Sequence, residues 1–256
     1  FIKAENPISE PPSYPIPDVL WTLAENVASL VDDGDTIQLG FGGLPHAVAE
    51  KLRDKKDLGV HTEMFSNSLY HLMDAGVITN DRKTINRGKA VCAFCWGDKD
   101  FNKFIDHNPA IEMRPTSYTN DPNTIMAHDN LVSINSALQI DLTGQVCSES
   151  LGTQIFSGTG GATDFAYGAF HSKGGKGIIA MTSTAKGGTI SRIAPTLTPG
   201  SIVSIQRNIV DYVVTEYGIA HLRHLPIHKR VQELIKIAHP DFREELKKEA
   251  ERLMFW

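Results

Sequence analysis

The chain has 256 residues, of which 41% are hydrophobic and 21% charged, and this composition excludes a disordered, collagen-like or fibrous protein. The formal net charge is −5 and the Lys and Arg residues are scattered, so we expect no nucleic-acid partner. No apolar run approaches the roughly 20 residues that span a bilayer, so we expect no membrane partner either. Three cysteines make no disulfide framework and favour a reducing, cytoplasmic location.

The first segment of the chain is polar and rich in proline, and it opens without Met. We therefore expect residues 1–16 to be a linker that enters from the missing N-terminal half of a longer polypeptide. Residues 17–256 are then expected to form one domain.

Helical and strand-like patterns alternate through the first half of the chain. Apolar residues at helical spacing from Val19 to Val31 predict a helix that ends at Asp33-Gly34. A short apolar strand, 36–39, runs into a Gly-rich loop, and a helix begins near Pro45. Strands are then predicted at 59–65, 90–94 and 111–114, with helices at 67–76 and 100–106.

The second half continues the alternation. Asp121-Pro122 is typical of a helix start, and two strands are predicted at 131–135 and 137–142. Further strands are predicted at 177–181, 201–205 and 211–215, and two helices within 227–253 are separated at His239-Pro240. This order predicts an α/β fold with an open, largely parallel sheet flanked by helices.

The first candidate binding feature is the loop Gly40, Phe41, Gly42, Gly43 between a strand and a helix. Glycine lets backbone N–H groups approach a ligand, and a helix start favours a phosphate or an oxyanion there. Pro45 stands where the dinucleotide fingerprint has its last glycine, and the Walker lysine is missing, so nucleotide sites of those two kinds are disfavoured. The alternative is a tight turn without a ligand.

The second candidate is Glu63, which lies at the end of an apolar strand about twenty residues after that loop. Such a carboxylate could be a base, a metal ligand or a covalent nucleophile, whereas most glutamates are simply solvated. A second glycine cluster, 157–165, contains Gly160 and Gly161 and frees further backbone donors. Two glycine loops that face one carboxylate would stabilise an anionic tetrahedral centre. Lys186 follows a strand, where it would meet a phosphate or lie in solvent.

Two other patterns are weaker. Cys92 and Cys95 form a C-x-x-C within a strand-like run, where positions three apart point to opposite faces. We therefore interpret them as core cysteines rather than as a redox pair or a zinc site. His224 and His228 are separated by Pro226, which disfavours the helix that would align them as metal ligands, so we expect no metal.

Six stretches together resemble the C-terminal half of the acetyl-CoA hydrolase/transferase family, the one-chain CoA-transferases. Within that family, the likeness is greatest to enzymes that act on 4-hydroxybutyrate or exchange butyrate and acetate. The stretches keep the family's order, and they are residues 33–48, 59–66, 134–146, 157–165, 182–195 and 213–222.

The resemblance implies a CoA-transferase that moves CoA between a short-chain acyl-CoA and acetate through a ping-pong reaction. Glu63 would be the nucleophile, and it would form a glutamyl-CoA thioester. CoA is then a substrate, with no tightly bound cofactor, and the family analogy adds a homodimer. By the same resemblance, CoA and the oxyanion sites involve Gly40, Phe41, Gly42, Gly43, Asn135, Leu138, Gly160, Gly161 and Lys186, with Ser157 and Glu216 as auxiliary residues.

Several alternatives stay open. Glu149 is a rival nucleophile because related two-subunit enzymes carry their glutamate in a similar S-E context, although it comes much later in the chain than Glu63. An acyl-CoA hydrolase of the same family would use water in place of the acceptor carboxylate. The chain could also be a CoA-binding module that is inactive without its N-terminal half. A sugar-phosphate isomerase of similar architecture is the most distant alternative.

Overall fold

The computed structural model describes residues 9–11 and 15–255. The predicted linker therefore lies largely outside the described residues. Its described part contacts the domain: the Trp96 indole donates a hydrogen bond of 2.9 Å to the carbonyl oxygen of Ser9, and Glu10 lies 3.8 Å from the Lys99 ammonium.

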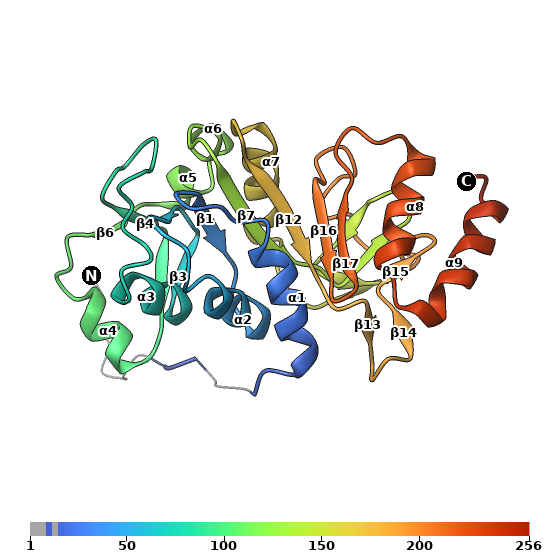
Figure 1. The fold of residues 1–256 in the computed structure, drawn as a ribbon, viewed down its shortest axis with the longest axis horizontal. Coiled ribbons are helices and arrows are strands. Elements are labelled where there is room, and N and C mark those ends of the chain that lie inside the picture. Colours follow the sequence, from blue (N-terminus) through green and yellow to red (C-terminus); the bar gives the residue numbers. More distant parts are fainter. Residues whose placement is uncertain (1–8, 12–14, 256) are drawn as a thin grey trace.

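A six-stranded sheet in the order β17-β16-β12-β7-β1-β2 runs through the middle of the molecule (Figure 1). Five of its strands are mutually parallel, and β17 pairs antiparallel with β16. The predicted open, largely parallel sheet is thus confirmed. The strands are β1 (Thr36–Leu39), β2 (Gly59–Val60), β7 (Leu131–Ser136), β12 (Lys176–Ala180), β16 (Tyr212–Thr215) and β17 (Gly218–His221).

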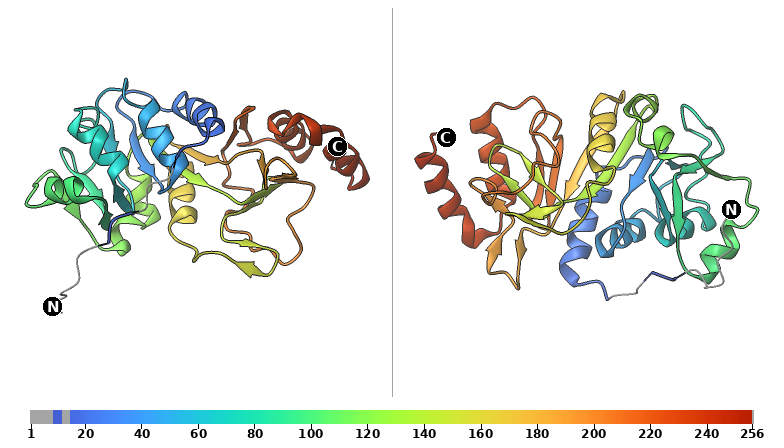
Figure 2. Two further views of the ribbon diagram at one scale, coloured as in Figure 1. Left: turned by 90° about the horizontal axis from the view of Figure 1, so that it is seen from below. Right: turned by 180° about the vertical axis from the view of Figure 1, so that it is seen from behind.

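Helices cover both faces of this sheet (Figure 2). Helices α1 and α2 pack together on one face, and α6 and α7 lie on the other. Helices α8 and α9 cover the far end beside β16 and β17, as two helices separated at His239-Pro240. The helices are α1 (Asp18–Ala28), α2 (Gly43–Lys51), α3 (Asn67–Asp74), α4 (Lys99–Ile105), α5 (Thr116–Thr119), α6 (Pro122–Met126), α7 (Ala162–His171), α8 (Ile227–Ile237) and α9 (Pro240–Arg252).

Short strand pairs extend the fold at both ends of the main sheet. Beyond β2 lie two parallel pairs, β3 with β5 and β4 with β6. On the other side, β8 pairs with β9 and β15, and two hairpins project, β10–β11 and β13–β14. These strands are β3 (Met64–Ser66), β4 (Ala90–Cys92), β5 (Phe94–Trp96), β6 (Ile111–Met113), β8 (Gln139–Asp141), β9 (Val146–Cys147), β10 (Ser150–Leu151), β11 (Gln154–Ile155), β13 (Thr184–Ala185), β14 (Ile190–Ser191) and β15 (Ile193–Ala194).

The strand predicted at 201–205 is wrong, apart from one bridge between Ile205 and Val146. Serine side chains form hydrogen bonds here in place of a backbone ladder. The backbone N–H of Ile202 donates to the Ser150 hydroxyl, and the backbone N–H of Gly152 donates to the Ser201 hydroxyl. Apolar alternation alone could not reveal these side-chain bonds. Two other predicted strands, 59–65 and 90–94, are each interrupted near the candidate nucleophile.

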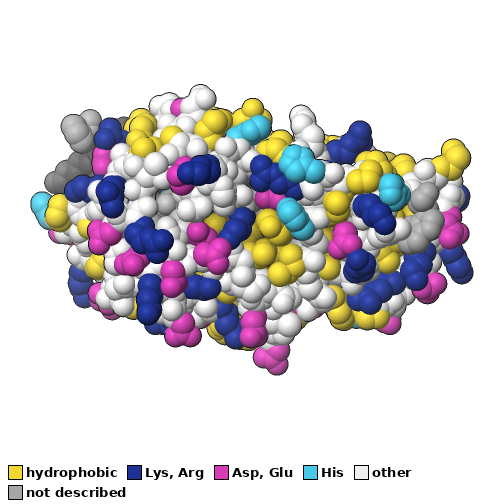
Figure 3. Space-filling view, turned by 45° about the horizontal axis from the view of Figure 1, so that its top comes forward, with side chains coloured by type: hydrophobic (Ala, Val, Ile, Leu, Met, Phe, Trp, Pro, Cys, Tyr) yellow, Lys and Arg dark blue, Asp and Glu magenta, His cyan; other side chains and the backbone are white. Residues whose placement is uncertain are grey.

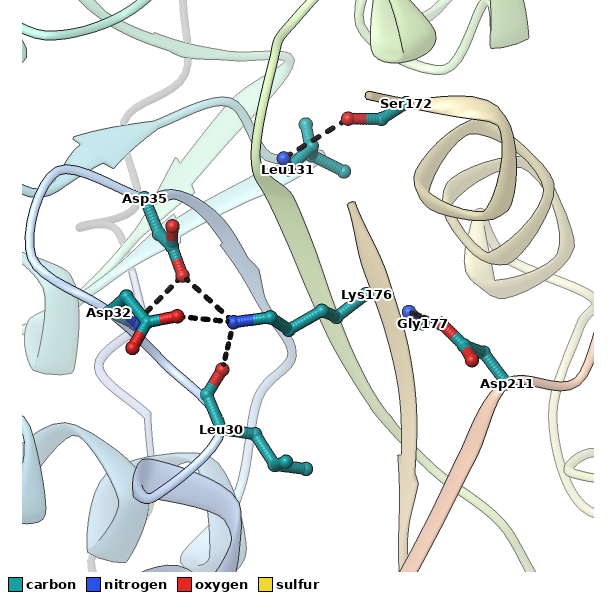
Figure 4. Close-up of polar contacts among 8 residues, drawn as sticks. All are labelled: Leu30, Asp32, Asp35, Leu131, Ser172, Lys176, Gly177 and Asp211. Carbon is teal, nitrogen blue, oxygen red and sulfur yellow. Dashed lines mark hydrogen bonds and ion pairs between the residues drawn. The ribbon is translucent and has the colours of Figure 1, made fainter. Parts of the chain in front are cut away.

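One lysine ties together the amino ends of the central strands (Figure 4). The Lys176 ammonium donates to the carbonyl oxygen of Leu30 at 2.7 Å and to the Asp32 carboxylate at 2.6 Å, and it lies 3.7 Å from Asp35. Asp35 is 4% exposed, and burial raises the pKa of its carboxyl group although Lys176 acts in the opposite direction. Lys176 therefore compensates a buried acidic group at the start of β12.

The outer edge of β2 is closed by side chains rather than by another long strand. The backbone N–H of Val60 donates to Asn80, and the Val60 carbonyl oxygen accepts from the Lys83 ammonium at 2.7 Å. Lys83 is almost fully buried, and burial lowers its pKa to about 7. These contacts satisfy the groups that an edge strand would otherwise leave unpaired.

The face that contains the amino ends of the strands shows acidic and basic side chains intermixed (Figure 3). Positive charge does not gather there into the continuous patch that nucleic-acid binding requires. Among the described residues, no helix combines the length and the apolar character that crossing a bilayer demands.

Replacing Lys176 with Met should lower the free energy of unfolding by about 1–3 kcal/mol, because Asp35 would be left buried without its cation. Urea denaturation measures the change. Asp32→Asn is the matched control: the Asp32 side chain is 75% exposed, so its loss should cost less than about 1 kcal/mol. Equal losses in the two variants would contradict the proposed role of Lys176.

Candidate active site

The register of the sheet brings three predicted site residues to one level at its carboxyl edge. Ile37 of β1 lies opposite Val60 on one side and Val132 on the other. Gly40, Glu63 and Asn135 each follow these paired residues by three positions. Ligands of open α/β sheets bind beyond the carboxyl ends of the strands, so this edge is where a site is expected.

Glu63 lies in the gap between β2 and β3, and its backbone is held from the side. Its carbonyl oxygen accepts hydrogen bonds from the backbone N–H groups of Ala93 (2.8 Å) and Phe94 (3.1 Å). These two donors fall at the break between β4 and β5. The predicted strand 90–94 is divided at Ala93, where two consecutive N–H groups bind one carbonyl oxygen and leave an extra residue in the ladder, as in a β-bulge.

The half-buried Glu63 carboxylate meets an amide and a glycine. The Asn120 side chain, at the end of α5, donates to Glu63 Oε2 at 2.9 Å. A Cβ atom added to Gly161 would lie 2.2 Å from Glu63 Oε2 and 2.4 Å from Asn120 Nδ2. Only glycine fits at this position without moving the carboxylate. Gly161 is also the N-cap of α7, whose N-terminal partial positive charge favours an anion.

The orientation of the Asn120 amide is fixed by its neighbour. The Thr119 hydroxyl donates to Asn120 Oδ1 at 2.9 Å, which leaves the amide NH2 group directed at Glu63. The Thr119 carbonyl oxygen accepts from Nε2 of His61 at 2.9 Å. The turn that carries Asn120 is thus anchored to the segment that carries Glu63.

Two fully buried histidines lie beneath this arrangement, with the rings of His61 and His128 4.5 Å apart. Burial lowers the pKa of His61 to about 3 and that of His128 to about 4. Both imidazoles are therefore neutral near pH 7, so neither neutralises the Glu63 carboxylate.

A second carboxyl group stands close to Glu63. Asp164, in the first turn of α7, has a raised pKa, chiefly because of burial; the Asn120 amide lowers it and the charge of Glu63 raises it. Sequence reasoning missed both Asn120 and Asp164 as site residues. Asp164 lies within the second glycine cluster, residues 157–165, which could have indicated it. No sequence motif indicates Asn120, which directly follows the short helix α5.

The first glycine loop lines a cavity of about 460 Å³ that also reaches Ser66 at the end of β3. Gly42 has a φ of +115°, which glycine tolerates and other residues rarely adopt, and it precedes the first turn of α2. Phe41 is 46% exposed and its ring lies 4.8 Å from that of Trp96. The cavity is lined by Glu10, Pro11, Ile16, Gly40, Phe41, Gly42, Gly43, His46, Ser66, Asn67, Ser68, His71, Trp96 and Asp98.

Asn135 pairs with a residue that sequence reasoning did not single out. Its amide exchanges two hydrogen bonds with that of Gln38 on β1, at 3.0 and 3.2 Å. Leu138 is half-buried just beyond β7, and its N–H donates to the Cys147 carbonyl oxygen. Both predicted residues therefore lie at or just beyond the carboxyl end of β7.

Glu216 acts on a neighbouring turn rather than on Glu63. Its carboxylate accepts from the backbone N–H and the hydroxyl of Ser183, at 2.8 and 2.6 Å. Arg192 donates to the carbonyl oxygens of Thr184 and Ala137 across the same turn. Glu216 thus positions the turn that leads into the β13–β14 hairpin, where Lys186 is exposed.

The remaining predicted residues lie on exposed loops. Gly160 has a φ of +56° and open space around it, and the Ser157 hydroxyl donates to the adjacent Gly158 carbonyl oxygen. Within the described parts of the chain, neither Ser157 nor Lys186 forms a hydrogen bond or ion pair with Glu63. The rival Glu149 is 5% exposed and precedes β10.

The structure contradicts the reason given for setting aside the C-x-x-C. The break at Ala93 turns the chain, and the sulfur atoms of Cys92 and Cys95 lie 3.7 Å apart instead of on opposite faces. His224 and His228 are exposed. Over residues 9–11 and 15–255, no three His, Cys, Asp or Glu side chains gather as a metal site would require.

Comparisons with known proteins place the chain in a family. Residues 97–250 match the family described as Acetyl-CoA hydrolase/transferase C-terminal domain, and the chain belongs to that family. The matched stretch contains Asn120, Asn135 and Gly161, whereas Glu63 precedes it.

The similar proteins include CoA-transferases. The chain is 49% identical to the 4-hydroxybutyrate coenzyme A transferase of Clostridium kluyveri, over 97% of this chain and 58% of that protein. It is 48% identical to the succinyl-CoA:cyclohexane-1-carboxylate CoA transferase of Geobacter metallireducens, over 99% and 58%. The solved structure of a 4-hydroxybutyrate CoA-transferase from Porphyromonas gingivalis superposes with a TM-score of 0.84 at 44% identity, covering 97% of this chain and 58% of that one. The chain thus spans less than two thirds of these relatives.

The two buried histidines predict how stability depends on pH. Unfolded imidazoles take up protons near the ordinary pKa of 6.5, whereas the folded ones resist protonation until about pH 4 or below. Stability should therefore fall as the pH drops below about 6.5. In His128→Asn, the free energy of unfolding measured by urea denaturation should depend less steeply on pH between about pH 7 and pH 5. The control His107→Asn, at a side chain that is 94% exposed, should leave the slope unchanged; a matching change in both variants would contradict the assignment.

Proposed function

We propose that the protein is a CoA-transferase that moves CoA between a short-chain acyl-CoA, such as 4-hydroxybutyryl- or butyryl-CoA, and acetate, with Glu63 as the nucleophile. The observation that carries the proposal is the meeting of the Glu63 carboxylate with the Asn120 amide and with Gly161 at the start of α7. Membership of the family and the names of the relatives support the reaction class.

The first half of the reaction converts Glu63 into a thioester. The Glu63 carboxylate attacks the thioester carbonyl carbon of the acyl-CoA, and collapse of the tetrahedral intermediate releases CoA thiolate and leaves an acyl-glutamyl anhydride. The thiolate then attacks the Glu63 carbonyl carbon, which releases the first carboxylate and leaves a glutamyl-CoA thioester. The second half runs in reverse. An acceptor carboxylate attacks the glutamyl-CoA thioester, which expels CoA thiolate and leaves a new anhydride. The thiolate then attacks the acceptor's carbonyl carbon, which forms the new acyl-CoA and releases the Glu63 carboxylate.

The surroundings of Glu63 suit both halves. Negative charge develops on an oxygen of the substrate and later on an oxygen of Glu63 itself, and backbone N–H groups near Gly161 and the 40–43 loop are the donors that would stabilise it. The Asn120 amide holds one carboxylate oxygen and leaves the other oxygen free to attack. We propose that Asn135, Leu138 and Lys186 lie along CoA, and that Glu216 and Ser157 act indirectly through their loops.

Partners and location belong to the same proposal. The relatives are longer than this chain, which is consistent with an N-terminal part that helps to bind the carboxylate substrate, and we propose a homodimer by family analogy alone. Three free thiols fit a reducing compartment, so we propose the cytoplasm. Because this chain spans only 58% of these two relatives, one alternative is also favoured, namely that this chain alone binds CoA without turnover.

Covalent trapping tests the nucleophile. The full-length gene product that contains this chain is incubated with butyryl-CoA, treated with borohydride or hydroxylamine, and digested for peptide mass mapping. We expect the modification at Glu63, and we expect Glu63→Ala to lose both the modification and transferase activity while still binding CoA in calorimetry. Modification at Glu149 would refute the assignment. Binding of CoA with no turnover in either form would favour the binding module.

Gly161→Ala tests the close approach to the carboxylate. The added Cβ would displace the end of the flexible Glu63 side chain, so the unfolding free energy should change by less than about 1 kcal/mol while the trapping rate falls by roughly 100-fold. Gly158→Ala is the matched control, because a Cβ at Gly158 meets open space. A trapping rate in Gly161→Ala equal to that of the control would show that the carboxylate can shift without loss of function.

A further inference from the structure

Cys92 and Cys95 form a thiol pair that the proposed reaction does not use. Their sulfur atoms lie 3.7 Å apart, although the residues belong to different strands, β4 and β5. A disulfide needs a sulfur–sulfur distance of about 2.05 Å, so a modest local movement would allow the bond to form. The third cysteine, Cys147, is buried elsewhere and donates to the Ser150 carbonyl oxygen.

The two residues between the cysteines are the ones that hold Glu63. The N–H groups of Ala93 and Phe94 both donate to the Glu63 carbonyl oxygen. Cys95 of β5 also pairs with Phe65 of β3, and Phe65 follows Glu63 by two positions in the chain. A backbone movement of residues 92–95 that draws the two sulfur atoms together would therefore act on the backbone of Glu63 through both of these contacts.

The pair combines one accessible thiol and one buried thiol. Cys92 is fully buried in the main core, whereas Cys95 is half-buried. The contact between the two thiols lowers the pKa of Cys95, although burial opposes the shift, and together with burial it raises the pKa of Cys92. Since the thiolate is the reactive form, Cys95 is the group that meets an external reagent first.

We propose that Cys92 and Cys95 are a redox-sensitive dithiol that small-molecule disulfides oxidise to an intrachain disulfide, and that this bond slows the reaction of Glu63. The Cys95 thiolate attacks one sulfur of the reagent and releases the first reagent thiolate. Cys92, as it loses its proton, then attacks the Cys95 sulfur of the mixed disulfide and releases the second. Two cysteine thiols are oxidised, one reagent disulfide is reduced to two thiols, and the two protons pass to the released thiolates.

The slowing rests on the proposed role of Glu63, whereas the disulfide itself does not. Closing the gap from 3.7 Å to about 2.05 Å moves the sulfur atoms by more than about 1 Å, and the share of this movement that the backbone of residues 92–95 takes up would shift the groups that bind the Glu63 carbonyl oxygen. Misplacement of a reacting group by this amount typically costs a large factor in rate.

The test treats the full-length gene product with oxidised glutathione and maps the cysteines by mass spectrometry of peptides. We expect a Cys92–Cys95 disulfide, a roughly tenfold or greater fall in the rate of Glu63 trapping by butyryl-CoA, and recovery of the rate with dithiothreitol. Hydrogen exchange at Ala93 and Phe94 should become faster in the oxidised protein. A stable glutathione adduct at Cys95 without the internal bond, or a disulfide with an unchanged trapping rate, would overturn the proposal.

Two substitutions complete the test. Cys95→Ser should retain the trapping rate and lose its sensitivity to oxidised glutathione, whereas Cys147→Ala should remain as sensitive as the unaltered protein. Sensitivity that persists in Cys95→Ser would refute the pair as the site. If Glu63 is not trapped even in the reduced protein, the proposed function fails, while peptide mapping and hydrogen exchange still decide whether the disulfide forms and moves the segment.

Discussion

Parallel pairing of β1 with β2 on one side and β7 on the other brings the proposed site residues together. Ile37 is opposite both Val60 and Val132, so Gly40, Glu63 and Asn135 leave the sheet at one level. A shift of one residue in any of these pairings would move the strand side chains to the opposite face of the sheet, and all four residues of β1 are buried where they now lie. The same pairing that buries the strand residues therefore also keeps the glycine loop, the carboxylate and the amide together.

The local environment of Glu63 is neutral but polar. A charged partner would hold the carboxylate in place by attraction and would reduce its nucleophilicity, whereas the Asn120 amide offers one hydrogen bond to one oxygen. The buried imidazole of His61 adds no charge, because burial lowers its pKa to about 3. Asp164 contributes a second acidic group, whose pKa is raised chiefly by burial and further by the charge of Glu63. This arrangement orients an anion without neutralising it.

The site residues that directly follow strands of the sheet could be predicted from the sequence. The contacts that depend on helices packed against the site could not. Glu63 and the 40–43 loop come directly after apolar strands, whose parallel pairing follows from the alternation of strands and helices. Gly161 was identified from its glycine cluster, and its contact with Glu63 depends on the placement of α7. Asn120 comes from a four-residue helix with no periodicity, and its role depends on a hydroxyl group beside it.

The incorrect interpretation of the cysteines has the same physical origin. Positions three apart point to opposite faces only while a strand continues, and here the strand is interrupted at Ala93, where the N–H groups of Ala93 and Phe94 share the Glu63 carbonyl oxygen. The break that secures the carboxylate's backbone is therefore also what brings Cys92 and Cys95 together. The proximity of the two thiols and the double hydrogen bond to the Glu63 carbonyl oxygen are therefore two consequences of one interruption of the strand at Ala93.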